Sequence, residues 1–442
     1  MTQKTILKKS MYYISVFISV LALSVLAVTL TAAIPQRYIK ANLAKSAEIY
    51  SSGNANIHAF GKGNENAKLD NRADQVLLSI LYCQDSTQSL KSGICSRYYD
   101  KNNDNILADY KSLISGKAQP NTYYTRYWHG SMVFIKPLLV FTDINGIRAA
   151  NALLLLALTA LVLWQMIRAK EKLLGFSLLA GMFSVAVYTV PFCIEFMPAF
   201  AVMLLSTVVI ISVVLKKEKY VGTVFLISGM AVCFFDFLTC ETLSFTVPVC
   251  TALILSFKNG KIKDFKNGLI YIIKNGLLWF LGYAGMFLSK FGITALFIQK
   301  SAFSEAAKNA SLRLSDVKII NLHGLGANRI FRNFVNLNLF DNAKTFGDLA
   351  LRIFIVSAVV FSLLYLYKKK NAFKKELYSL LFIIMLIPYI RYAALNNHSF
   401  VHSFFTFRAQ LVTIMLGLYM VLESIDKTAF KKDFKGFKKS RR

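Results

Sequence analysis

The stretch Met197–Asp236 reads MPAFAVMLLSTVVIISVVLKKEKYVGTVFLISGMAVCFFD. It consists of two apolar runs, 197–215 and 220–236, separated by the basic turn Lys216-Lys-Glu-Lys219. Each run approaches the roughly 20 apolar residues that a helix needs to cross a hydrocarbon layer of about 30 Å. Two such runs joined by a short charged turn are typical of antiparallel transmembrane helices, so the stretch predicts a helical membrane protein.

The composition of the whole chain favours the same class. The 442 residues carry 52 Lys and Arg against 23 Asp and Glu, which gives a formal net charge of +29. Yet 55% of the residues are hydrophobic, only 17% are charged, and the mean hydropathy is +0.47. This apolar content excludes a disordered chain. A soluble nucleic-acid-binding protein would carry more charge, so we expect no nucleic-acid partner.

Ten segments are apolar enough to be interpreted as transmembrane helices. The first resembles a signal peptide, because Lys4, Lys8 and Lys9 precede it, but its apolar run is longer than the roughly 7–15 residues of a cleaved segment. We therefore expect an uncleaved anchor. The ten predicted spans are 12–34, 147–167, 174–191, 197–215, 220–236, 241–257, 270–290, 349–367, 377–391 and 403–423.

The distribution of Lys and Arg predicts the orientation, because cytoplasmic loops are enriched in these residues. If the N-terminus is cytoplasmic, every short inside turn is basic, as in 168–172, 216–219 and 368–370. The short outside turns 192–196, 237–240 and 392–402 contain neither Lys nor Arg. We therefore expect both termini in the cytoplasm.

The predicted fold is an all-α, polytopic membrane bundle of about ten transmembrane helices, with two extracytoplasmic loops that contain helices. The chain divides into six parts on this basis. They are the N-terminal tip and first helix (1–34), an extracytoplasmic loop with an interfacial helix (35–146), helices two to seven (147–290), a second extracytoplasmic loop (291–348), helices eight to ten (349–424) and a basic cytoplasmic tail (425–442).

The first loop contains a pair of acids on a predicted helix, 69–81. Asp70 and Asp74 are four residues apart, so they project from the same flank and repel each other slightly. A nearby cation, a metal or a hydroxyl substrate would justify the pair. The structural alternative is that Asp70 caps the helix and Asp74 is a first-turn acid that the helix dipole favours.

An aromatic cluster ends the first loop, in Tyr123-Tyr-Thr-Arg-Tyr-Trp-His-Gly130. The apolar run 131–142 that follows is too short to span a membrane. It predicts an interfacial or re-entrant helix at the outer leaflet, where Trp and Tyr are enriched. Arg126 and His129 are then candidates for binding a lipid phosphate, and a simple aromatic anchor is the alternative.

Cys83 and Cys95 lie in the same loop, and outside the cytoplasm they are candidates for a disulfide. Two free thiols are the alternative. The six cysteines show no metal-binding spacing.

Ionisable residues in or beside the spans gather at the predicted outer edge, where we expect a binding site because charges in membranes are costly. His398 and His402 are spaced for one helical face, which suits a metal pair, hydrogen bonds to a sugar or lipid phosphate, or simple capping. Arg391 and Arg408 suit phosphate oxygens, although Asp236 or Glu241 would provide a structural salt bridge for Arg408. The candidate substrate-binding or lipid-phosphate-binding residues here are Glu195, Asp236, Glu241, Arg391, His398, His402 and Arg408.

The arrangement is similar to the family C glycosyltransferases, membrane enzymes that use polyprenyl-phosphate sugars. The resemblance lies in the basic-inside topology, the long first loop with its early acidic pair, and the interfacial helix that ends this loop. Four segments also resemble recurring signatures of uncharacterised bacterial multi-pass proteins. They are Leu69-Asp-Asn-x-x-Asp74, Arg126-Tyr-Trp-His-Gly130, Phe235-Asp-Phe-Leu-Thr239 and Asn397-His-Ser-x-x-His402.

The family resemblance implies that Asp70 or Asp74 is the catalytic base of an inverting sugar transfer. The donor would be a polyprenyl-phosphate-linked sugar and the acceptor a cell-envelope glycan, with membrane lipid as the other partner. No cofactor is certain, and a divalent metal is possible. A polymerase or ligase of lipid-linked polysaccharide, a flippase or transporter, and a non-catalytic envelope protein are the alternatives.

Overall fold

The protein is an all-α membrane protein. The computed structural model describes residues 3–50, 56–58, 68–101, 105–298, 311 and 375–424. Within these residues, seven helical segments are long and apolar enough to cross a membrane. They are Lys4–Ala32, Ile144–Arg168, Met197–Lys216, Glu218–Phe235, Phe265–Phe297, Lys375–Ala394 and Ser403–Ser424.

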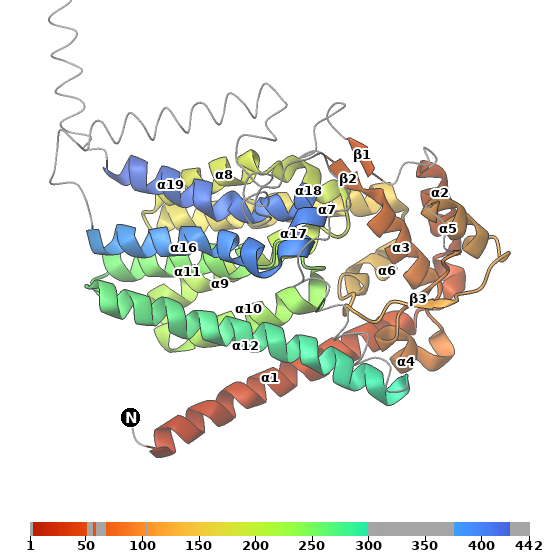
Figure 1. Cartoon of the computed structure of the whole chain (residues 1–442), viewed down its shortest axis with the longest axis horizontal. Helices are drawn as coiled ribbons and strands as arrows, with labels where there is room; N and C mark the ends of the chain where they lie inside the picture. Colours follow the sequence, from red (N-terminus) through yellow and green to blue (C-terminus); the bar gives the residue numbers. More distant parts are fainter. Residues whose placement is uncertain are drawn as a thin grey trace, which may run out of the picture.

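These segments correspond to labelled helices that run the length of the bundle (Figure 1). The helices are α1 (Gln3–Ala32), α7 (Ile144–Arg168), α9 (Met197–Lys216), α10 (Val221–Phe235), α12 (Phe265–Phe297), α16 (Lys375–Ala394) and α19 (Leu411–Ser424). The short elements η5 (Glu218–Tyr220), α18 (Ser403–Thr406) and η7 (Phe407–Gln410) lead into α10 and α19, and α17 (Asn396–Val401) follows α16.

Two further predicted spans form shorter apolar helices, α8 (Lys172–Ser184) and α11 (Leu243–Lys258). Helix α8 ends early because Ala186 adopts a left-handed conformation with a φ of 55° and the 3₁₀ helix η4 (Val187–Phe192) follows. The predicted span 349–367, most of the second loop and the tail 425–442 lie outside the described residues.

The described residues between 36 and 139 form a layer of short elements at one end of the bundle, which we call the capping layer (Figure 1). Its two small sheets are antiparallel, β1 with β2 and β3 with β4. The layer comprises η1 (Gln36–Tyr38), α2 (Lys40–Ile49), β1 (Asn56–His58), β2 (Lys68–Asp70), α3 (Asn71–Tyr82), η3 (Ser86–Gln88), α4 (Ser89–Ile94), β3 (Arg97–Tyr98), α5 (Ile106–Ile114), β4 (Thr122–Tyr123) and α6 (Met132–Leu139).

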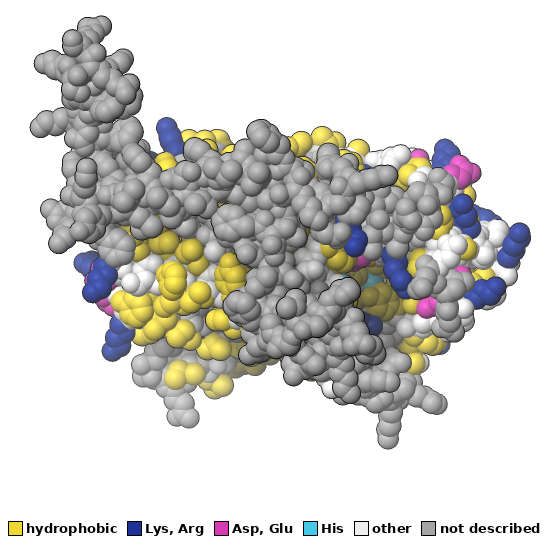
Figure 2. Space-filling view, turned by 45° about the horizontal axis from the view of Figure 1, so that its top comes forward, with side chains coloured by type: hydrophobic (Ala, Val, Ile, Leu, Met, Phe, Trp, Pro, Cys, Tyr) yellow, Lys and Arg dark blue, Asp and Glu magenta, His cyan; other side chains and the backbone are white. Residues whose placement is uncertain are grey.

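The bundle and the capping layer have separate apolar cores, and a third cluster joins them. Trp128 lies in this third cluster with residues of α1, α10 and α12. On the described part of the face seen in Figure 2, hydrophobic side chains occupy the middle of the bundle, whereas Lys and Arg lie toward its two ends. This is the surface expected of a bundle surrounded by lipid.

Glycines set the close approach of α10 and α12. A Cβ at Gly282 would lie 2.2 Å from the carbonyl oxygen of Leu226, and one at Gly229 would lie 2.0 Å from that of Trp279. Neither backbone oxygen can swing away, so these helices pack only because both positions lack a side chain. Small residues serve the same purpose in other membrane helix pairs.

We therefore expect the substitution Gly282→Ala to destabilise the protein by about 1–3 kcal/mol, the usual cost of overpacking. The matched control is Gly292→Ala on the same helix, where no atom lies within 4 Å of the added Cβ. The control should be neutral or slightly stabilising, since Ala is the better helix former. Thermal unfolding midpoints in detergent measure the difference, and equal midpoints for the two variants would refute this packing.

Candidate functional site

Asp70 lies where β2 meets α3 and is partly exposed. Its Oδ1 accepts a hydrogen bond from the backbone N–H of Ala73 at 3.0 Å, which makes Asp70 the N-cap of α3. Burial raises the pKa of its carboxyl above the usual value. Asp70 therefore caps the helix, as in the structural alternative, and it is partly exposed.

Asp74 is fully buried and connects the capping layer to the bundle. Its carboxylate accepts hydrogen bonds from the Tyr50 hydroxyl at 3.1 Å and from the backbone N–H of Ile194 at 2.8 Å. The Arg148 guanidinium lies 4.0 Å away, and burial raises the pKa of Asp74 to about 6. Both oxygens already have partners within the protein, so the geometry gives Asp74 a structural role.

Glu195 lies in the turn before α9 and is buried. Its Oε1 has no hydrogen-bond partner among the described residues. Burial raises the pKa of Glu195 well above its usual range, and neighbouring carboxylates raise it further, while Arg408 opposes the shift. The acids that act on Glu195 are Asp70 and Asp74 from the capping layer and Asp236 from the bundle. The turn also contacts the capping layer directly, since the Ile194 N–H donates to Asp74 and the Cys193 thiol donates to the Asp70 carbonyl.

Arg408 is buried beside the same turn, in η7. Its guanidinium donates to the Thr189 hydroxyl at 2.8 Å and lies 4.3 Å from the centre of the Phe196 ring. The predicted alternative, a salt bridge to Asp236 or Glu241, is wrong. Asp236 accepts hydrogen bonds from Thr239 in its own turn, and Glu241 pairs with Arg391 of α16.

Glu241 and Arg391 form a buried ion pair with two hydrogen bonds, Nε to Oε1 at 3.0 Å and Nη2 to Oε2 at 3.1 Å. Arg391 also donates to the Ser399 hydroxyl at 3.0 Å and to the Leu238 carbonyl at 2.8 Å. The geometry therefore favours a structural role for Arg391 over the predicted phosphate binding, because its guanidinium already donates hydrogen bonds to three residues of the protein.

The Leu238 carbonyl also lies 2.9 Å from Nε2 of His398. Leu238 has a φ of 65°, a strained conformation for a residue with a branched side chain. Arg391 and His398 therefore both contact the Leu238 carbonyl, and these two contacts stabilise the strained turn.

Asp236 ends α10 and is held locally, because its carboxylate accepts from the backbone N–H and the hydroxyl of Thr239 at 2.9 and 2.5 Å. The rings of His398 and His402 lie 4.8 Å apart, although His402 follows the last residue of α17. No group of three or more His, Cys, Asp or Glu is placed to hold a metal ion in the part of the chain that the structure describes.

Arg126 and His129 lie in the turn before α6. The His129 ring is 5.6 Å from the Phe237 ring, and its Nδ1 is 3.0 Å from the Ser96 hydroxyl. The Arg126 guanidinium lies 5.5 Å from the Tyr124 ring. The turn is packed against the bundle, and His129 is buried rather than exposed at a surface.

The predicted disulfide is absent from the structure, in which Cys83 and Cys95 are free thiols. Cys83 packs against the core of the capping layer, whereas Cys95 belongs to the cluster that joins the layer to the bundle. The two side chains therefore face different cores.

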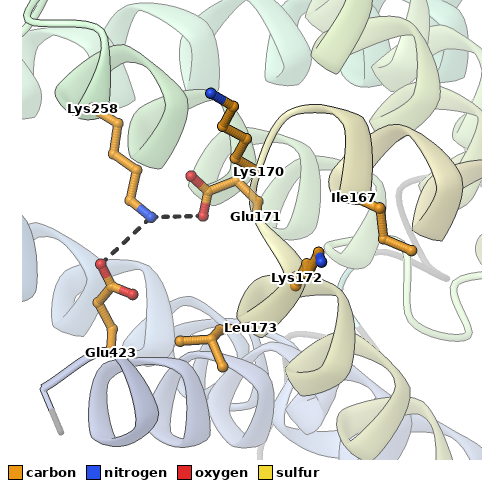
Figure 3. A pocket seen from close by; sticks show the side chains of 7 residues that line it. All are labelled: Ile167, Lys170, Glu171, Lys172, Leu173, Lys258 and Glu423. Carbon is orange, nitrogen blue, oxygen red and sulfur yellow. Dashed lines mark hydrogen bonds and ion pairs between the residues drawn. The ribbon is translucent and has the colours of Figure 1, made fainter. Parts of the chain in front are cut away.

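The opposite end of the bundle carries the basic turns and a pocket of about 240 Å³ (Figure 3). Lys258 there pairs with Glu171 at 2.9 Å and with Glu423 at 3.4 Å. These pairs connect the ends of α11 and α19 to the start of α8. The amino groups at this end are therefore spatially separate from the acids near Glu195.

No family model, curated protein or solved structure matches this chain. The residues of the site therefore provide the basis for a functional assignment. Sequence reasoning missed Tyr50 and Arg148 beside Asp74, and also Lys290, a buried lysine of α12 that donates to the Ile94 carbonyl. A lone Lys near the end of an apolar helix was a visible signal for Lys290, whereas nothing in the sequence marks Tyr50 as a partner of Asp74.

Proposed function

We propose that this protein is a glycosyltransferase-like membrane enzyme. It transfers a sugar from a polyprenyl-phosphate carrier to a cell-envelope acceptor at the outer face of the membrane. The observation that carries the proposal is the set of contacts around Glu195. The neighbouring Ile194 N–H donates to Asp74, and the Cys193 thiol donates to the Asp70 carbonyl. The Arg408 guanidinium lies 4.3 Å from the centre of the Phe196 ring. Acids that differ in exposure, next to cationic side chains, suit proton transfer coupled to loss of an anionic leaving group.

The proposal includes a topology of about ten spans with both termini in the cytoplasm. The turns 168–172 and 258–264 meet at one end of the bundle, since Lys258 contacts Glu171. Lys261 pairs with Glu218 of the turn 216–219 at 3.0 Å, at the same end. The capping layer lies at the other end (Figure 1). The positive-inside rule then favours an extracytoplasmic capping layer.

Asp70 is the best placed base of the predicted pair, because it is partly exposed while Asp74 is enclosed. In the proposed step, Asp70 takes the proton of the acceptor hydroxyl as its oxygen forms a bond to the anomeric carbon. The bond between that carbon and the phosphate oxygen breaks, and the lipid phosphate leaves as an anion. Nearby cations stabilise the leaving charge.

The test is lipid mass spectrometry of a deletion strain. We expect a polyprenyl-phosphate monosaccharide to accumulate, because its consumer is missing, and to disappear when the wild-type gene is restored. Accumulation of a longer lipid-linked repeat unit would favour a polymerase or ligase instead. An unchanged lipid profile, together with an unchanged surface glycan, would contradict a role in sugar transfer.

A further inference from the structure

The turn Arg126–Ser131 is fixed against two membrane helices. The Gly130 N–H donates to the Phe234 carbonyl of α10 at 2.9 Å, and Trp128 Nε1 donates to the Met286 carbonyl of α12 at 2.9 Å. A Cβ at Gly130 would lie 2.5 Å from the Phe234 oxygen, so only glycine permits this approach. The side chains of the turn are therefore held in defined positions.

Three buried polar atoms of this turn have no hydrogen-bond partner among the described residues. They are Arg126 Nε, His129 Nε2 and Ser131 Oγ. Native proteins satisfy about 90% or more of such atoms, so three in six residues is unusual. His129 is also strained, with a φ of 57°. Strained residues with unused donors cluster at ligand sites.

Lys290 of α12 is a further cation beside the turn Arg126–Ser131. It is fully buried, its Nζ lies 5.3 Å from the centre of the Trp128 ring, and it donates to the Ile94 carbonyl. Burial lowers the pKa of His129 well below its usual value, and the charges of Lys290 and Arg126 lower it further. Within the described part of the chain, no ion pair joins Arg126 or Lys290 to an Asp or Glu.

This surrounding differs from that of two cations that have an acid beside them, the buried Arg391 and the half-buried Arg148. Arg391 is paired with Glu241, and Arg148 lies beside Asp74. A buried positive charge without an acid is costly unless an anion accompanies it. Arg and Lys beside an imidazole N–H suit phosphate oxygens in particular.

We infer that Arg126, His129 and Lys290 form a binding site for the phosphate group of a lipid phosphate or for free phosphate. His129 Nε2 acts as a donor there when the Ser96 hydroxyl donates to Nδ1. The site adjoins the turn 236–241 through the contact of His129 with Phe237. Only the sugar carried by the phosphate rests on the proposed function; binding of the anion does not.

The test measures binding to the purified full-length protein by native mass spectrometry. The probes are a polyprenyl monophosphate, the neutral polyprenol of the same length, and inorganic phosphate as a competitor. We expect Lys290→Met to weaken binding of the polyprenyl phosphate about tenfold, which corresponds to loss of one charged hydrogen bond. Lys290→Arg should retain much of the binding.

The matched control is Lys274→Met, on the same helix but exposed. It should leave binding unchanged. If Lys290→Met does not fold, Arg126→Gln provides a second test, because the Arg126 side chain is only half-buried. If inorganic phosphate competes with the polyprenyl phosphate, free phosphate is the ligand. If inorganic phosphate does not compete, the lipid phosphate is the ligand. Equal binding of the polyprenol, or no effect of either variant, would overturn the inference. Phosphate binding without lipid accumulation in the deletion strain would contradict only the proposed function.

Discussion

Replacing Arg391 by Met is expected to destabilise the protein by about 3–5 kcal/mol, the usual cost of removing one partner of a buried ion pair. The substitution leaves the Glu241 carboxylate buried without its cation. It also removes the donors to Ser399 and to the strained Leu238 carbonyl. The thermal unfolding midpoint in detergent measures the loss. Because both side chains are 6% exposed or less, little water can compensate.

The double variant Arg391→Met, Glu241→Met should recover part of this stability, since it leaves neither charge unpaired. The matched control is Lys261→Met, which removes an exposed pair with Glu218 whose side chains are 35% and 41% exposed. Exposed pairs contribute at most about 1 kcal/mol. A loss for Arg391→Met as small as that of the control would show that the buried pair does not hold this end together.

Asp70→Asn is expected to reduce sugar transfer by about 10²–10⁴-fold, the usual contribution of a general base. The variant is well suited to the question because Asn is as good an N-cap as Asp. The hydrogen bond from Ala73 can therefore persist while the base is lost. Transfer is measured in membranes with equal amounts of the variant and the wild type.

Asp74→Asn should behave differently, because Asp74 accepts from Tyr50 and Ile194 and neighbours Arg148. We expect lower stability and a lower amount of protein, with the activity per folded molecule changed less than in Asp70→Asn. If Asp70→Asn is fully active and Asp74→Asn is folded but inactive, the two roles are reversed. Full activity in both would exclude the acidic pair from the chemistry.

The sequence predicted the long spans well because each depends on local composition. The runs 197–215 and 377–391 correspond to α9 and α16, and their apolar content alone was sufficient. The run 174–191 was predicted as one span, yet the chain leaves the helix near Ala186. Its left-handed conformation depends on packing and has no local sequence signal.

The site was predictable as a region but not as a set of contacts. Glu195, Asp236 and Glu241 were expected near each other because adjacent helices end at the same side. Which acid pairs with which arginine depends on tertiary geometry, so the sequence left a salt bridge of Arg408 as an alternative and did not show that Glu241 pairs with Arg391. Lys290 was overlooked because a single Lys at a span edge usually reaches water, whereas here it is buried beneath the capping layer.

Lipid mass spectrometry of the deletion strain carrying either the wild-type or the Asp70→Asn gene tests the central claim most directly. The account predicts that the wild-type gene removes the accumulated polyprenyl-phosphate sugar. It also predicts that Asp70→Asn, present in the membrane at the same level, leaves the sugar accumulated. Removal of the accumulated lipid by Asp70→Asn as complete as that by the wild type would contradict it.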